Sequence, residues 1–233
     1  ERVAELLKAE WELFTKQTGK SAEESRRALK SLPLGVTSSF QHWDPYPISI
    51  VSAKGAWMTD VDGRQLLDLS MGFGAMLAGH LNPVIVEEVK KALETGTLFV
   101  TPSPISTDAA ERICRRFGID QVRFTNSGTE STMYAVRTAR AATGKNAVVK
   151  IEGGYHGSYD PFVVSSKPPI DKIGDPNNPI PHTPDGIVPG EMHVVPYNNA
   201  EALERTFKKY ASSIACFILE PVLENIGIVL PDE

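Results

Sequence analysis

The chain is poor in cysteine and carries no excess of basic residues. Its two cysteines, Cys114 and Cys216, lie far apart in apolar segments, so they are predicted to be reduced, buried thiols and not a disulfide pair. Lys and Arg total 24 against 29 Asp and Glu, which gives a net charge of −5. Nucleic-acid-binding modules usually concentrate positive charge, so we expect no nucleic-acid partner.

Long apolar runs and targeting signals are also absent from the 233 residues. No stretch approaches the roughly 18 apolar residues of a membrane span, so no membrane partner is expected. The two cysteines that are predicted to be reduced favour a cytoplasmic location, and no secretion signal is recognised after Glu1. The chain stops shortly after Leu230 without a closing element, and we expect it to be the N-terminal part of a longer subunit.

Two further absences narrow the chemistry. Neither the GxxxxGK[ST] nucleotide loop nor the GxGxxG dinucleotide turn occurs in the sequence, which disfavours a nucleotide-dependent enzyme. Four histidines lack the spacing to cysteine or carboxylate that a metal site needs, so no metal is expected: His80, His156, His182 and His193.

The chain begins with a helical arm, predicted over residues 1–31. Apolar residues of 1–17 fall on one helical stripe among charges, which indicates an amphipathic helix that covers another surface. Ser21 and Glu24 have the spacing of a capping box, so we expect a second short helix that reaches about Lys30.

Residues 32–95 are predicted to form a small α+β segment. Apolar runs within 48–69 flank an Asp62-Gly63 turn, a pattern typical of an antiparallel meander. Helical spacing follows Pro83, a residue that suits the first turn of a helix.

Residues 96–233 alternate between strand and helix patterns. This alternation predicts an α/β domain with a mainly parallel sheet and helices on both faces. A proline-rich stretch at 165–191 is expected to be a lid or a disordered insertion. The expected helices are roughly 108–117, 129–142 and 200–210, and the expected strands are 121–125, 147–151, 193–195 and 214–219.

The first chemical signal is Asn126-Ser127-Gly128-Thr129-Glu130, where a predicted strand gives way to a helix. Such a helix N-terminus offers unpaired N–H groups and a positive dipole end, while Gly128 lets an anion approach. The hydroxyls of Ser127 and Thr129 add donors, so the segment predicts a phosphate site. Ordinary helix capping by Ser127 or Thr129 explains it about equally well.

The second signal is Gly154-Tyr155-His156-Gly157, just after the strand predicted at 147–151. The glycines place an aromatic ring and an imidazole at the sheet edge where open α/β folds bind ligands, and Tyr155 is suited to stack on a planar ring. Taken alone, an ordinary turn with a half-buried tyrosine is the more frequent explanation.

The third signal is Glu220-Pro221-Val222 with Asn225, at the end of a predicted buried strand. Pro221 ends the ladder, so a carboxylate and then an amide reach the same sheet edge. The alternative is a strand-end carboxylate that pairs with a nearby helix terminus. Because all three signals follow successive strands of one predicted sheet, a single ligand would collect them.

Together these motifs resemble the class III aminotransferases, pyridoxal-phosphate enzymes of fold type I, and most of all the glutamate-1-semialdehyde aminomutases. The resemblance covers roughly residues 32–231 and implies an aspartate aminotransferase-like fold. Residues 96–233 would then be the first part of the large cofactor-binding domain. Further matching segments are 57–69, Gly79-His80 with Asn82-Pro83, and Ala139-Arg140 with Thr143-Gly144.

The resemblance implies pyridoxal 5′-phosphate as cofactor, an electron sink that the protein orients. It also implies an enzyme that moves an amino group between an amine or amino acid and a carbonyl compound through Schiff-base intermediates. The implied cofactor residues are Ser127, Gly128 and Thr129 at the phosphate, Tyr155 stacked on the ring with His156 beside it, Asn225 at the phenolic oxygen, and Glu220 in support beneath.

The resemblance places two catalytic groups, the Schiff-base lysine and the aspartate at the pyridine nitrogen, beyond Glu233. No catalytic residue is therefore expected within the chain, and a non-catalytic phosphate-binding homologue or fragment stays an alternative. The lysines present lack the family's flanking pattern. Lys145, Lys150 and Lys167 are interpreted as solvated charges or turn residues.

Departures from the family pattern bear on the substrate. Ser38 matches a serine on the substrate side, and Phe73 stands where a tryptophan near the substrate is expected. Gln41 replaces the carboxylate-binding arginine and cannot match the bidentate binding of a guanidinium. An intermolecular aminotransferase is therefore favoured over an intramolecular aminomutase, and the fold type implies a homodimer.

Overall fold

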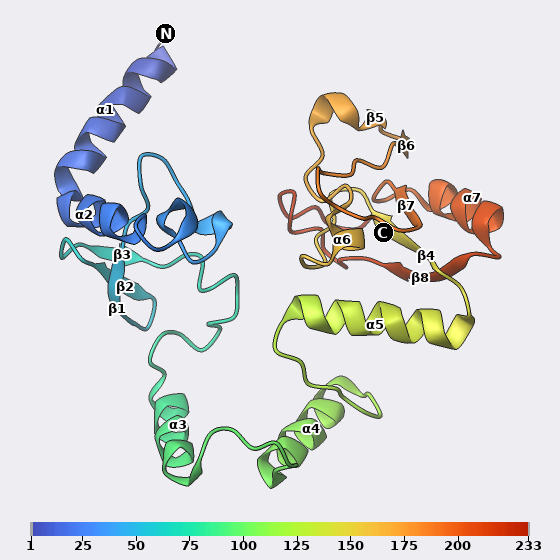
Figure 1. Ribbon diagram of the computed structural model, residues 1–233, viewed down its shortest axis with the longest axis horizontal. Helices are drawn as coiled ribbons and strands as arrows, with labels where there is room; N and C mark the ends of the chain where they lie inside the picture. Colours follow the sequence, from blue (N-terminus) through green and yellow to red (C-terminus); the bar gives the residue numbers. More distant parts are fainter. Residues whose placement is uncertain (1, 233) are drawn as a thin grey trace. The chain divides into compact units, whose positions relative to one another are not determined.

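The computed structural model describes residues 2–232, which divide into two compact units, Glu1–Pro104 and Ile105–Glu233. The first unit opens with helices α1 (Arg2–Gln17) and α2 (Gly19–Ala28) (Figure 1). Both helices predicted for the N-terminal arm are therefore confirmed. No residue of α1 is buried, so its apolar stripe is left exposed in this chain.

Helix α2 is not capped in the way its sequence indicated. The expected capping box of Ser21 and Glu24 is wrong, because the helix begins before Ser21. The carboxylate of Asp62 instead accepts from the backbone N–H of Lys20 at 2.7 Å and of Ser21 at 3.1 Å, and from the Ser21 hydroxyl. Amides in a first helical turn need acceptors, and here a residue far along the chain supplies them.

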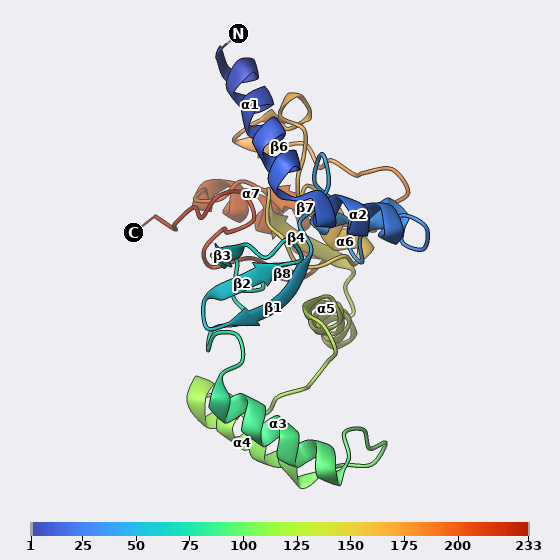
Figure 2. The same ribbon diagram turned by 90° about the vertical axis from the view of Figure 1, so that its left-hand side faces the viewer.

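The predicted antiparallel meander is confirmed, and Figure 2 shows its three strands side by side. Strands β1 (Ile50–Lys54), β2 (Trp57–Asp60) and β3 (Gln65–Leu67) pair in sequence order. In the turn, the buried Asp60 carboxylate accepts from Arg64 Nε at 2.7 Å. Burial favours a higher pKa for Asp60, but the bonds from Arg64 and from backbone N–H groups lower that pKa below its usual value.

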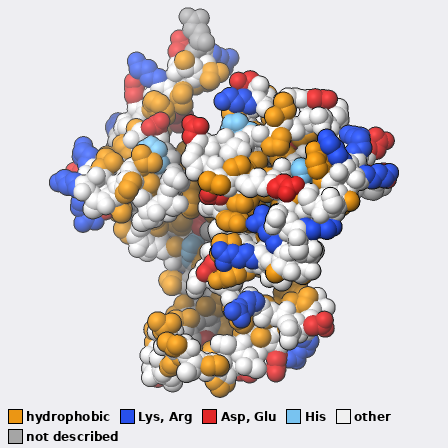
Figure 3. Space-filling model, turned by 45° about the vertical axis from the view of Figure 1, so that its right-hand side comes forward, with side chains coloured by type: hydrophobic (Ala, Val, Ile, Leu, Met, Phe, Trp, Pro, Cys, Tyr) orange, Lys and Arg blue, Asp and Glu red, His pale blue; other side chains and the backbone are white. Residues whose placement is uncertain are grey.

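Helix α3 (Pro83–Thr95) follows in the first unit, and helix α4 (Pro104–Phe117) begins at the boundary and belongs to the second unit. Helix α3 starts at Asn82, whose side chain accepts from Val84 N, and α4 spans the helix predicted around 108–117. Figure 3 shows that hydrophobic side chains reach the surface over much of the visible face. Exposed apolar residues of α3 are Val84, Ile85, Val89 and Leu93.

The second unit is built on a parallel sheet in the order β7-β4-β8. The central strand β4 (Ala147–Ile151) pairs in parallel with β7 (Met192–Val195) and with β8 (Ile214–Ile218). All five residues of β4 are buried, as expected for a strand covered on both faces. The predicted mainly parallel sheet is thus confirmed.

Helices cover both faces of this sheet, as predicted (Figure 1). On one face, Val148 packs with Val136 of α5 (Gly128–Thr143) and with Phe162 of α6 (Asp160–Val163). On the other, Val149 and its strand neighbours pack against α7 (Ala200–Tyr210). The alternation of side chains along β4 therefore decides which helix each one meets.

Three expectations need correction. The strand predicted at 121–125 is absent, since no described segment forms a ladder with it. The stretch 165–191 is ordered: it holds a 3-10 turn, η3 (Ile170–Lys172), and a short hairpin of β5 (Gly174–Asp175) and β6 (Asn178–Pro179). Both cysteines are free, but Cys114 and Cys216 are only partly buried. Within residues 2–232, no helix has the length and apolarity to cross a membrane.

Candidate functional site

The three chemical signals of the sequence meet at the carboxyl ends of β4 and β8. The backbone N–H of Tyr155 donates to Glu220 Oε1 at 2.6 Å, which joins the loop after β4 to the end of β8. The backbone N–H of Ser158 donates to Thr129 Oγ1 at 3.1 Å, which joins the same loop to the start of α5. The structure therefore gathers residues from three distant segments around one sheet edge.

The start of α5 is capped and still open to an anion. Ser127 Oγ accepts from Glu130 N at 3.1 Å, so the capping explanation of this serine is realised. Among the described residues, the amides of Gly128 and Thr129 have no acceptor. A Cβ built on Gly128 meets nothing within 4 Å, so the positive end of the helix faces open space.

Helix α5 also fixes the backbone of the Tyr155 loop. Thr132 Oγ1 donates to His156 O at 2.7 Å. Gly157 has a φ of +100°, and a Cβ there would lie 2.6 Å from Thr129 Oγ1, so only glycine fits this close approach. Thr132, one helical turn after Gly128, is a site residue that the sequence motifs did not indicate, and its hydroxyl bonds to the loop 24 residues further along the chain.

Glu220 holds two loops at once. Its Oε1 accepts from Tyr155 N, and its Oε2 accepts from Glu224 N at 3.0 Å. Tyr155 is 52% exposed as a residue, which leaves its ring available to a ligand. The carboxylate of Glu220 therefore anchors the backbone that carries the Tyr155 ring.

His156 is buried, and its Nε2 has no hydrogen-bond partner among the described residues. Its ring meets the Phe162 ring edge-on at 5.9 Å between centroids. Burial, helped by the Lys150 charge, lowers the pKa of His156 to about 4. The imidazole is therefore neutral at physiological pH, and it provides no cation next to the site.

The buried imidazole predicts a stability loss in mild acid. Between its usual pKa of 6.5 and its folded pKa of about 4, the unfolded chain binds a proton that the folded chain does not. The free energy of unfolding should therefore fall as pH falls through this window, by on the order of 3 kcal/mol. Urea unfolding of the apoprotein at pH 7 and at pH 4.5 measures it. His156→Asn should remove most of the slope and His182→Asn should keep it; equal slopes in both variants contradict the prediction.

Asn225 donates both hydrogens of its side-chain amide to backbone carbonyl groups. Nδ2 donates to Gly153 O and to Ser166 O, each at 2.8 Å. Carbonyl oxygens only accept, so the orientation of this amide is settled by its partners. Asn225 therefore has only its Oδ1 left for a ligand, and toward that ligand it can act only as an acceptor.

A family model of the class III aminotransferases matches residues 39–233. The chain belongs to the class III aminotransferase family. A glutamate-1-semialdehyde 2,1-aminomutase of Methanocella arvoryzae is 38% identical over 214 residues, covering 91% of this chain and 50% of the relative. The class III aminotransferase chain thus spans about half the length of the curated relatives that it matches.

Solved structures agree with this membership. A structure described as a transaminase with PLP bound has a TM-score of 0.83 and 34% identity, covering 93% of this chain and 50% of that one. An omega-transaminase from Sphaerobacter thermophilus has a TM-score of 0.87 and 32% identity, covering 91% and 49%. The class III aminotransferase chain therefore has the predicted fold type I architecture.

Lys150 is not the solvated charge that we expected. In the class III aminotransferase chain its side chain is completely buried, and its Nζ donates to Gly154 O at 2.9 Å and to Phe162 O at 3.0 Å. A usable signal was its position inside Ala-Val-Val-Lys-Ile, since a strand buried on both faces leaves no solvent for a lysine. Lys145 Nζ donates to Ala211 O at 2.6 Å in an exposed hydrogen bond.

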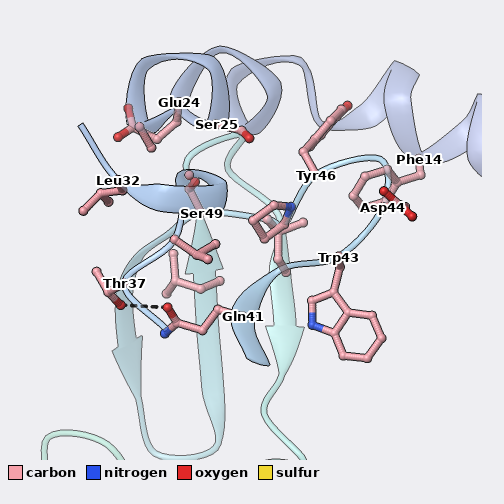
Figure 4. A pocket seen from close by; sticks show the side chains of 16 residues that line it. Phe14, Glu24, Ser25, Leu32, Thr37, Gln41, Trp43, Asp44, Tyr46 and Ser49 are labelled. Atoms are coloured by element: carbon pink, nitrogen blue, oxygen red, sulfur yellow. Dashed lines mark hydrogen bonds between the residues drawn. The ribbon is translucent and has the colours of Figure 1, made fainter. Parts of the chain in front are cut away.

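The two expected substrate residues lie in the first unit of the aminotransferase chain. Ser38 N donates to Gln41 Oε1 at 3.3 Å. Phe73 is 81% exposed, and its ring meets the Phe40 ring edge-on at 5.4 Å. A cavity of about 660 Å³ in this unit is lined by Gln41 but by neither Ser38 nor Phe73 (Figure 4). Thr37 Oγ1 also donates to Gln41 Oε1, so the Gln41 amide presents free hydrogens.

Proposed function

We propose that the full-length protein is a pyridoxal-phosphate-dependent aminotransferase that moves an amino group between an amine or amino acid and a carbonyl compound. One observation carries the proposal: the open start of α5 is bonded directly to the loop of the half-exposed Tyr155 ring. A ligand that carries both a phosphate and a planar ring fits these two neighbouring features: its phosphate at the start of α5 and its ring on Tyr155. The cofactor supplies the electron sink, and the protein binds and orients it.

The residues present fit that cofactor. The amides of Gly128 and Thr129, with the hydroxyl hydrogens of Ser127 and Thr129, offer donors to a phosphate without any basic side chain. The Tyr155 ring offers a stacking surface. Asn225 Oδ1 is a pure acceptor, so at the phenolic oxygen it would favour the protonated form.

A second candidate is the intramolecular aminomutase, which the name of the 38% identical relative supports. The presence of Gln41 favours the aminotransferase over the aminomutase. It offers amide hydrogens and no positive charge, so it would bind a substrate carboxylate more weakly than a guanidinium does. Ser38 and Phe73 would lie near that substrate. A homodimer in the cytoplasm completes the proposal, supported by the exposed apolar side chains of α1 and α3 and by the two free cysteines.

Spectroscopy and kinetics of the full-length protein test the proposal. Added pyridoxal 5′-phosphate should give a visible absorbance band that borohydride abolishes. Ping-pong kinetics that require a second amino acceptor identify the aminotransferase, whereas isomerisation without any acceptor identifies the aminomutase. Cofactor binding without turnover on any amine or amino acid would leave the non-catalytic homologue. A protein that does not bind pyridoxal 5′-phosphate contradicts both the aminotransferase and the aminomutase proposal. It would leave only a non-catalytic homologue that binds phosphate.

A further inference from the structure

The most unusual charge in the second unit is the ammonium group of Lys150. It is completely buried at the centre of the sheet. Four oxygens lie within hydrogen-bond distance of Nζ, and all belong to the segment 154–166 that carries Tyr155 and His156. They are Gly154 O at 2.9 Å, Phe162 O at 3.0 Å, Val164 O at 2.5 Å and Ser166 Oγ at 3.2 Å.

This set of partners suits a charged lysine. Three of the four oxygens are carbonyls, which only accept, and an ammonium group has three hydrogens to give while a neutral amine has two. Burial lowers the pKa of Lys150 to about 8, with Glu152 and Glu220 opposing that change, so the charged form persists at neutral pH. The remaining titratable group nearby is His156, which is neutral there.

One peptide group is held from both ends by opposite charges. The carbonyl of Gly154 accepts from Lys150, and the N–H of the same peptide bond, at Tyr155, donates to Glu220. Charge-assisted hydrogen bonds are the stronger ones, and here they match the two ends of the peptide dipole. Holding this peptide plane fixes the backbone on the N-terminal side of Tyr155 and so restricts the directions in which its side chain can leave the backbone.

Stability alone gives little reason for a lysine at this position. Taking a charge out of water is costly, and an apolar residue of similar size usually stabilises a core at least as well. The ammonium group instead holds the loop that carries Tyr155 and His156, through its hydrogen bonds to residues 154–166.

We propose that Lys150 is a positioning residue that, together with Glu220, clamps the Gly154–Tyr155 peptide and thereby aims the Tyr155 ring at the bound cofactor. Its effect on binding rests on the proposed function. The clamp itself is a property of the chain with or without a ligand, so the two ideas can fail separately.

The decisive variant is Lys150→Met in the full-length protein, with Lys145→Met as the matched control, a lysine two residues before the start of β4. Amide hydrogen exchange of the apoprotein should become about tenfold faster at Tyr155 and His156, while exchange in α7 stays unchanged. The affinity for pyridoxal 5′-phosphate should fall at least about tenfold. Lys145→Met should change neither quantity.

A double-mutant cycle with Glu220→Gln adds a readout that a general loss of stability does not move. If both residues clamp one peptide, the double variant should bind the cofactor little worse than the weaker single variant. If Lys150→Met does not fold, Ser166→Ala removes one of the four acceptors without leaving a buried charge unpaired. It should change exchange and affinity in the same direction, about twofold to fivefold.

The outcomes are distinguishable. Uniformly faster exchange across the second unit, unchanged cofactor affinity in a folded Lys150→Met or Ser166→Ala variant, or additive effects in the cycle would each overturn the positioning role. Local acceleration at Tyr155 in a protein that binds no pyridoxal 5′-phosphate would keep the clamp and overturn the proposed function instead.

Discussion

Gly157→Ala is expected to weaken pyridoxal 5′-phosphate binding by roughly tenfold to a hundredfold, the equivalent of about 1–3 kcal/mol of backbone strain. The added Cβ would lie 2.6 Å from Thr129 Oγ1 and 2.8 Å from Thr129 Cα. The second of these atoms is backbone and cannot rotate away. Either α5 or the loop must move, and the start of α5 would then separate from Tyr155.

Titration of the apoprotein with the cofactor, followed by tyrosine fluorescence or absorbance, measures the effect. Gly144→Ala is the matched control, because Gly144 also has a positive φ, +68°, at the end of the same helix but has nothing within 4 Å of a Cβ. It should cost stability through backbone strain and leave affinity unchanged. Wild-type affinity in Gly157→Ala would show that the contact between loop and helix does not govern binding.

Glu220→Gln is expected to be comparably damaging. Each carboxylate oxygen accepts one backbone N–H, from Tyr155 at 2.6 Å and from Glu224 at 3.0 Å. A glutamine can serve only one of them, since its NH₂ group would face the other N–H. One donor is left unpaired, at a cost of about 1–3 kcal/mol, so we expect cofactor affinity to fall about tenfold to a hundredfold.

The comparison variant is Glu224→Gln, four residues further along, where the side chain is exposed. It removes the same charge from the same loop and leaves both bonds to Glu220 intact, so binding should stay within about twofold of wild type if surface charge contributes as little as usual. Equal losses in the two variants would mean that net negative charge, and not the anchoring of Tyr155, explains the Glu220 effect.

Much of the second unit could be predicted from the sequence because its signals are local. The strand at 147–151, the helix after Ser127 and the glycines around Tyr155 each follow from residues within a few positions of one another. Their convergence followed from one rule, that the carboxyl ends of parallel strands share an edge. The individual cofactor roles of these residues stay predictions.

Two of the differences from the expected structure depend on partners far along the chain. Asp62, about forty positions further along, accepts from the first amides of α2 in place of the expected cap. Capping rules consider only residues next to the helix start, so they could not predict this partner. Residues 121–125 have strand-like composition, but a ladder needs a neighbour, and the described chain offers none. Lys150 differs for another reason: its four acceptors all follow within sixteen residues, and burial of its strand overrides the usual preference of a lysine for solvent.

That short spacing bears on the order in which the chain folds as it is made. The oxygens around Lys150 lie 4 to 16 residues after it, whereas the strands that flank β4 begin only at Met192 and Ile214. Contacts between near neighbours in sequence form sooner than distant strand pairings. Since synthesis delivers the N-terminal residues first, we expect the Tyr155 loop to close around its lysine before the sheet assembles. The sheet would then be completed around a loop whose shape is already set.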